Sequence, residues 1–287
     1  MKKAIIAITI ILILFFVGCN NREKPQLAAT TLPVYEFTNI LCEGTGISVS
    51  RLITENVSCL HDYTLQVSQM RILESAEAVI ISGAGLEDFL EDALYGANHI
   101  IDASSAVVPV EHHDHDHDDH HHNSDPHIWL SPENAKVMSE TICTRLSELF
   151  PEHQIRFEEN LSILFEKLDG LQAYGEETLQ TLSCRDLITF HDGFSYFASC
   201  FDLKILKAVE EESGSEASAK ELIELIQLVN SHNLPAIFTE TNGSTSAAEV
   251  IAAETGVPVF SLDMAMAGDS YFESMYHNID TVKEALG

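Results

Sequence analysis

Apolar residues follow two patterns along the chain: short continuous runs, and stretches in which they recur every three or four positions. Short runs bounded by turn residues are typical of buried strands, and the second pattern is typical of helices with one apolar face. The two patterns alternate in both halves of the chain, which predicts parallel sheets covered by helices on both faces. The expected strands are 27–31, 47–53, 78–82, 99–102, 186–190, 203–206, 236–240 and 257–262.

The middle of the chain, residues 133–182, carries only the helical pattern. Ser131 and Pro132 supply an N-cap and a proline at the first helical position, and a second helix should follow Pro151. We therefore expect an α/β fold of two lobes, each with a parallel sheet flanked by helices. One long, rigid helix (151–182) should join the N-terminal lobe (27–150) to the C-terminal lobe (183–287). An ordinary helical hairpin inside a single domain is the alternative.

The other helices expected from this pattern fall between the predicted strands. They are 33–44, 68–76, 86–94, one ending at Cys200, 218–231, 244–255 and 270–286. Gly170 and Gly175 should be the weak points of the long helix, because glycine is a poor helix former.

The first residues have the organisation of a secretory signal. Two lysines precede an apolar run, Ala4–Val17, which is too short for a typical spanning helix but suits a signal peptide. The Gly-Cys pair at its end resembles a bacterial lipobox, which implies cleavage before Cys19 and a lipid on that cysteine. We expect a signal peptide (1–18), a lipidated tether (19–26) and an extracytoplasmic chain anchored to the cell membrane. An uncleaved N-terminal anchor is the alternative, and it also places the remainder outside the cytoplasm.

Composition narrows the classes of partner. The chain is 45% apolar and 21% charged, with a formal net charge of −30. This charge argues against binding nucleic acid or an anionic membrane through a basic patch, and it favours cations. We expect a monomer that binds no nucleic acid. Six cysteines without a CxxC pair indicate neither a zinc ribbon nor a thioredoxin-type site, and we expect at most one disulfide, with Cys184 and Cys200 as candidates.

Four side chains with metal-binding chemistry each lie between a predicted strand and the next helix: His61, His127, His191 and Asp269. Loops of this kind gather at the carboxyl ends of parallel strands, where ligands bind. The first two belong to the N-terminal half and the others to the C-terminal half, so a crevice between lobes could bring all four together. Three imidazoles and a carboxylate form a four-coordinate site suited to Zn²⁺. A site filled entirely by protein favours carriage of the ion over catalysis.

Six motifs resemble those of the zinc- and manganese-specific solute-binding proteins of ABC transporters. In chain order they are HDYTLQVSQ, SGAGLEDFL, DPHIWLSPENA, FHDGFSYFA, IFTETN and GDSYFESM, and the resemblance covers about residues 27–287. It implies a metal held between two α/β lobes, capture of Zn²⁺ and delivery to an ABC permease powered by its ATPase. The ligands it implies are His61, His127, His191 and Asp269.

Some assignments within the resemblance stay open. Glu240 is expected to support a ligand histidine, with direct coordination as the rival, and water could replace Asp269 as the fourth ligand. Manganese-type members carry glutamate where His191 stands, and nitrogen in place of oxygen favours Zn²⁺ over Mn²⁺. Leu60 replaces a usual proline, and 66–69 replaces a usual Pro-Ser-Asp. A manganese carrier and a zinc-dependent hydrolase remain alternatives.

Seven histidines crowd into a segment (111–124) that lacks apolar periodicity, and we expect a disordered loop that binds several metal ions loosely. They are His112, His113, His115, His117, His120, His121 and His122. A merely solvating loop is the simpler alternative, and an adhesin or metal buffer that uses only this loop is a further one. Met264 and Met266 are expected to fill apolar gaps rather than to bind copper.

Overall fold

The computed structural model of the protein describes residues 26–55, 60, 63–108, 125–209 and 217–287. The predicted signal peptide, the lipidated tether with Cys19, His61 and the histidine-rich loop lie outside these residues. In the described part of the chain, no helix is long and apolar enough to span a bilayer.

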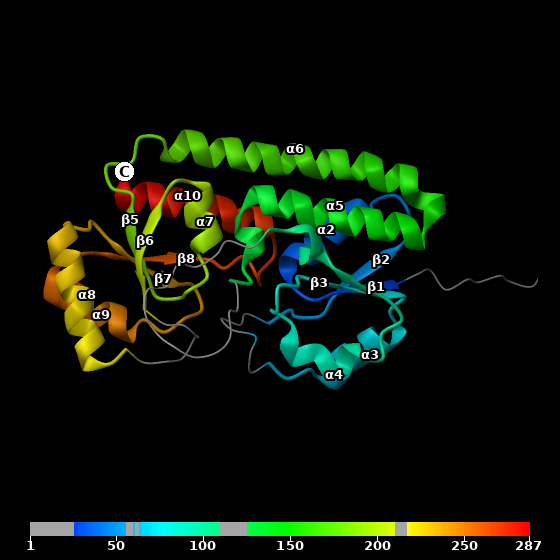
Figure 1. Ribbon diagram of the computed structural model, residues 1–287, viewed down its shortest axis with the longest axis horizontal. Coiled ribbons are helices and arrows are strands. Elements are labelled where there is room, and N and C mark those ends of the chain that lie inside the picture. The colour runs from blue at the N-terminus through cyan, green and yellow to red at the C-terminus, as the bar shows by residue number, and fades with distance from the viewer. Residues whose placement is uncertain (1–25, 56–59, 61–62, 109–124, 210–216) are drawn as a thin grey trace, which may run out of the picture.

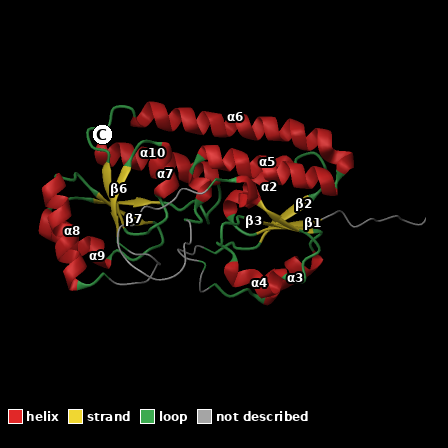
Figure 2. Cartoon of the chain, in the orientation of Figure 1, coloured by secondary structure: helices red, strands yellow, loops and turns green. Residues whose placement is uncertain are grey.

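Two four-stranded parallel sheets form the centres of the two lobes (Figure 2). The N-terminal sheet has the order β2-β1-β3-β4, and the C-terminal sheet has the equivalent order β6-β5-β7-β8. Their strands are β1 (Gln26–Ala29), β2 (Ser48–Arg51), β3 (Ala78–Ile81), β4 (Ile100–Asp102), β5 (Asp186–Thr189), β6 (Lys204–Ala208), β7 (Ile237–Glu240) and β8 (Val259–Leu262). Each predicted strand is present, and the predicted α/β fold with two sheets is confirmed.

Helices cover both sheets (Figure 1). They are α2 (Leu32–Leu41), α3 (Val67–Ser75), α4 (Glu91–Leu94), α5 (Pro132–Leu149), α6 (Gln154–Leu179), α7 (Ser195–Cys200), α8 (Ala219–His232), α9 (Ser246–Thr255) and α10 (Tyr271–Leu286). The helix expected over 86–94 is reduced to a 3₁₀ turn, Asp88–Leu90, followed by the single turn of α4. The expected helix 133–150 begins at Pro132, with the side chain of Ser131 accepting a hydrogen bond from the backbone N–H of Asn134.

The long helix α6 runs over both lobes (Figure 1) and continues a 3₁₀ turn that begins at Pro151. Asn160 bonds it to the N-terminal lobe through the Leu41 carbonyl at 2.8 Å, and Tyr174 bonds it to Asp280 of α10 at 2.5 Å. It also packs along α5, so the linking helix is at the same time one arm of a helical hairpin. Both interpretations of this region therefore describe part of the structure.

Gly175 does not weaken α6 in the way that its helix propensity predicts. A Cβ at this position would overlap the ring of Phe201, so the missing side chain lets α6 lie directly against the end of α7. The helix continues past it to Leu179. Close packing against the C-terminal lobe therefore compensates for the poor propensity of glycine.

One hydrophobic core is continuous through both lobes, and a smaller one lies beneath α8 and α9. The larger core includes Phe37 from α2, Trp129 from the turn before α5, and Tyr271 from α10, all fully buried. Because these aromatic residues come from both halves of the chain, the lobes share part of their core.

Cys184 and Cys200, the candidates for a single disulfide, are not bonded to each other. Both are free thiols, as are Cys42 and Cys143 among the described residues. The Cys200 thiol donates to the side-chain oxygen of Gln172 in α6 at 3.0 Å, whereas the Cys184 thiol faces the carbonyl of Asp186. The two sulfur atoms therefore have different neighbours, although their elements are adjacent in sequence.

Candidate metal centre

His127 is buried at the start of the 3₁₀ turn Ile128–Leu130, in front of helix α5. Asp125 holds His127 in place with a single carboxylate oxygen. This oxygen accepts a hydrogen bond from the His127 backbone N–H at 2.9 Å and lies 2.8 Å from the ring nitrogen Nδ1. An ionised carboxylate only accepts hydrogen bonds, so this contact places the ring proton on Nδ1 and leaves the lone pair on Nε2. Asp125 therefore orients the imidazole as metal-binding histidines are oriented.

Asp125 was missed in the sequence-based prediction, although a signal was available. An aspartate two residues before a histidine readily bonds to the backbone ahead of it. The side chain of Asp125 is almost completely buried, which is unusual for a carboxylate unless a partner holds it.

His191 follows strand β5 and lies against His127, with ring centroids 5.2 Å apart and the rings nearly perpendicular. Both rings are buried. The two histidines come from opposite halves of the chain, so the structure brings together two of the four predicted ligands. Glu240, at the end of the neighbouring strand β7, places Oε2 3.6 Å from His191 Nδ1. Glu240 thus lies beside the ring nitrogen that a supporting carboxylate would contact.

Gly193 stands where the two imidazoles meet. A Cβ added to this residue would lie 2.7 Å from His191 Cδ2, 2.8 Å from His127 Nδ1 and 2.5 Å from the methyl group of Met264. Real Cβ atoms do not approach other atoms so closely, so only glycine fits here without displacing the rings. Met264 and Met266 are buried within the main core, as expected for gap-filling residues, and Met264 also forms an apolar wall beside the histidines.

His61 lies outside the described residues, but the chain on either side of it is well anchored. Leu60 is buried. The side-chain amide of Gln69 donates to the Leu52 carbonyl at 2.7 Å and to the Tyr63 hydroxyl at 2.6 Å. Gln66 and Gln69 also form a reciprocal capping box at the start of α3. The replacement of Pro-Ser-Asp at 66–69 therefore still gives a firm start to the helix after this loop.

Asp269 is exposed in the loop between β8 and α10. Among the described residues, no group of three or more histidine, cysteine, aspartate or glutamate side chains is arranged to hold a metal ion. The described part of the centre is accordingly the pair His127 and His191, with Asp125 and Glu240 beside it. Metal coordination by His61, His127, His191 and Asp269 stays a prediction.

The model of the protein family described as "Zinc-uptake complex component A periplasmic" (ZnuA) matches residues 27–285. A crystal structure of ZnuA superimposes with a TM-score of 0.82 at 32% identity, covering 92% of this chain and 100% of that one. The Zn(II)-bound ZnuA-like domain of Streptococcus pneumoniae AdcA superimposes with a TM-score of 0.76 at 26% identity, covering 92% and 99% of the two chains.

Curated sequences agree with these structures. The zinc-binding lipoprotein AdcA of Streptococcus pneumoniae serotype 4 is 29% identical over 99% of this chain and 61% of its own length. A putative metal-binding protein of Treponema pallidum (strain Nichols) is 27% identical over 92% of this chain and 88% of its own. This chain thus spans about three fifths of AdcA.

The chain belongs to the ZnuA family of zinc-uptake binding proteins. It is an extracytoplasmic, metal-binding component of an ABC uptake system, and the family implies an ABC permease as the partner. Members of this family are transport proteins and not enzymes, so a divalent metal ion is the cargo and not a cofactor.

Proposed function

We propose that this protein captures Zn²⁺ outside the cytoplasm and hands it to its permease, whose transport step is powered by a separate ATPase. The ligands in this proposal are His61, His127, His191 and Asp269, with Glu240 orienting His191. The observation that carries this proposal is the contact between His127 and His191. These two imidazoles are buried, come from opposite lobes, and have ring centroids 5.2 Å apart. A lipid on Cys19 would keep the receptor at the membrane that holds the permease.

Zinc is favoured over manganese by the ligand atoms. Imidazole nitrogen suits Zn²⁺, whereas Mn²⁺ sites are richer in carboxylate and water oxygen. A centre with His61, His127 and His191 offers three nitrogens and matches the usual tetrahedral ligand sets of Zn²⁺. The relatives support this choice, since AdcA of Streptococcus pneumoniae is named a zinc-binding lipoprotein. A manganese carrier of the same architecture is the second candidate.

Purified without added metal, the protein is expected to contain close to one equivalent of tightly held zinc and little manganese. His191→Glu should weaken Zn²⁺ binding by about 100-fold and bring the affinities for Zn²⁺ and Mn²⁺ closer together, because a nitrogen ligand becomes an oxygen ligand. Elemental analysis gives the metal content, and competition titrations give both affinities. His277→Glu is the matched control, because His277 is exposed on α10 and its ring contacts Thr281 of the same helix. An unchanged metal preference in His191→Glu would refute the selectivity argument.

The histidine-rich loop is proposed to have a separate task. Seven imidazoles in a segment without apolar residues would bind ions loosely, since ordering such a chain around each ion costs conformational entropy. Deleting 111–122 should therefore remove weak zinc binding while one tight equivalent remains. Isothermal titration of the full-length and shortened proteins measures both classes of site. Complete loss of zinc binding on deletion would indicate instead a metal buffer that uses only this loop.

A further inference from the structure

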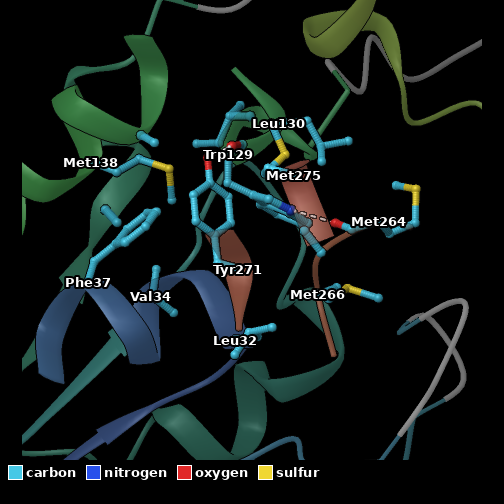
Figure 3. Close-up of a cluster of buried hydrophobic side chains, with 14 of the residues drawn as sticks. Leu32, Val34, Phe37, Trp129, Leu130, Met138, Met264, Met266, Tyr271 and Met275 are labelled. Carbon is cyan, nitrogen blue, oxygen red and sulfur yellow. Dashed lines mark hydrogen bonds between the residues drawn. The ribbon is translucent and has the colours of Figure 1, made fainter. Parts of the chain in front are cut away.

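Residues 264–271 follow the last strand of the C-terminal sheet, yet their backbone is bonded to the N-terminal half of the chain. The indole N–H of Trp129 donates to the Met264 carbonyl at 2.8 Å, as Figure 3 shows. Two residues further on, the Met266 carbonyl accepts from the backbone N–H of Leu32, the first residue of α2, at 3.1 Å. We name residues 264–271 the crossing segment, because it leaves one lobe and docks on the other.

The end of the crossing segment is anchored in the shared core. Tyr271 is fully buried, its hydroxyl donates to the Trp129 carbonyl at 2.8 Å, and its ring meets the Phe37 ring edge-on at 4.9 Å (Figure 3). Burial also raises the pKa of the Tyr271 hydroxyl well above its ordinary value, so this group stays a hydrogen-bond donor. An aromatic ring with one satisfied polar atom is a firm attachment between packed elements.

Asp269 lies within the crossing segment, and the backbone on both sides of it is held by charged side chains of the N-terminal lobe. Before it, Arg51 donates from Nη1 to the Gly268 carbonyl at 2.7 Å. After it, the Glu36 carboxylate accepts from the Tyr271 backbone N–H at 2.6 Å and from the Ser270 hydroxyl at 3.2 Å. Gly268 has φ of +92°, a conformation in which a side chain would be strained, so the chain turns sharply at this anchor.

Arg51 also connects two of the loops that are expected to supply ligands. It is the last residue of β2, the strand before the loop that contains His61. Its bond to Gly268 therefore ties the end of that strand to the residue next to Asp269. His191, by contrast, follows strand β5, which pairs with β7, and its ring lies beside Glu240 at the end of β7.

We propose that Arg51 and Glu36 are positioning residues that fix Asp269 on the N-terminal lobe, so that Asp269 and His127 keep one relative position while His191 is carried by the C-terminal sheet. The proposal rests on the proposed function, because it assumes that Asp269 is a zinc ligand. An exposed carboxylate in a loop must be ordered before it can coordinate, and two anchors supply that order in advance. Release of the ion would then begin when His191 withdraws.

A double-mutant cycle on zinc affinity tests this inference in the full-length protein. Arg51→Met and Glu36→Ala should each weaken zinc binding by about 10-fold, the size expected for a residue that orients a ligand. Asp269→Asn should weaken binding by about 100-fold. In the Asp269→Asn background, Arg51→Met and Glu36→Ala should have less than about a twofold further effect, because they no longer have a ligand to position.

Two control variants separate positioning from general loss of stability. Glu36→Gln keeps an acceptor for the Tyr271 N–H and can still bond to the Ser270 hydroxyl, so it should restore most of the affinity that Glu36→Ala loses. Arg185→Met removes an arginine that also donates to backbone carbonyls, those of Leu179, Phe201 and Asp202, all in the C-terminal half. It should lower the melting temperature at least as much as Arg51→Met does, yet leave zinc affinity unchanged.

The possible failures are distinguishable. If the unmodified protein holds no zinc, the proposed function itself fails. If it holds zinc but Asp269→Asn has no effect, Asp269 is not a ligand and the inference falls while the function stands. If Arg51→Met and Glu36→Ala weaken binding equally with and without the Asp269 carboxylate, or do not weaken it at all, these residues are not positioning Asp269.

Discussion

Gly193→Ala is expected to lower the zinc affinity by at least about 100-fold while the protein remains folded. The new methyl group would lie within 3 Å of both His127 and His191, and neither ring has space to retreat because both are buried. The Met264 methyl can move away, since it is the end of a flexible side chain. The two imidazoles must instead rotate away from the orientation in which they would bind the metal. The backbone of Gly193 is not in the left-handed region, so alanine adds only the steric overlap.

Gly170→Ala is the matched control for this substitution. Gly170 lies in α6, and a Cβ there would have no atom within 4 Å. The same chemical change should leave zinc binding intact and stabilise the helix by roughly 0.5–1 kcal/mol. Titration calorimetry measures affinity and circular dichroism measures unfolding for both variants. Normal zinc affinity in Gly193→Ala would mean that the metal does not bind where His127 and His191 meet.

Most of the fold could be predicted because strand and helix periods differ clearly in this sequence. The strands are short and almost continuously apolar, as β3 (AVII) illustrates, since both faces of a parallel sheet are covered. The failures arose where tertiary contacts outweigh local pattern. The stretch 86–94 has the pattern of one helix, but it forms a 3₁₀ turn and a single α-helical turn, which begin directly after the buried Glu87. Gly175 was predicted to weaken the long helix, but a glycine is needed at this position because any Cβ would overlap the ring of Phe201.

The candidate site could be predicted only in part. The positions of His127 and His191 followed from a general rule, that side chains after parallel strands gather at one edge of a sheet. Gly193 could not be assigned a role in this way, because its importance lies in contacts with these rings that only the folded chain creates. Asp125 had a local signal, its place two residues before His127, that the prediction did not use. Asp269 was assigned to the C-terminal half by its place in the sequence, whereas the backbone around it is bonded to Arg51 and Glu36 of the N-terminal lobe.

Glu87 is expected to make the stability of the protein fall as the pH rises from about 4.5 to about 7. Its carboxyl group is buried behind the turn at residues 82–85, and this burial raises its pKa from 4.5 to about 7. Hydrogen bonds from the Thr30 hydroxyl and the backbone N–H groups of Ser82 and Gly83, at 2.6–2.9 Å, oppose the shift but do not cancel it. The negative charge of Asp102 adds to the shift.

The direction follows from proton binding in the two states. Between pH 4.5 and pH 7 the folded protein keeps the Glu87 proton that the unfolded chain has lost, so each rise in pH within this window favours unfolding. Above pH 7 the Glu87 carboxyl is ionised in both states, and the loss in the free energy of unfolding is complete. A displacement of the pKa from 4.5 to about 7 corresponds to about 3 kcal/mol. This is a large share of the stability of an ordinary domain.

The Glu87 contribution is isolated by comparing the protein with Glu87→Gln, because other groups also titrate between pH 4.5 and pH 8. Glutamine cannot ionise, but its NH₂ group faces donors that the carboxylate accepts from, so the variant should be less stable than the parent at pH 4.5. As the pH rises to 8, the parent loses about 3 kcal/mol that the variant keeps, so the difference between their unfolding free energies in urea should shrink by that amount. Asp88→Asn makes the same change of charge at an exposed neighbour and should show no such trend. A pH-independent difference for Glu87→Gln would mean that the buried carboxylate is ionised throughout, its three hydrogen bonds having outweighed the loss of hydration.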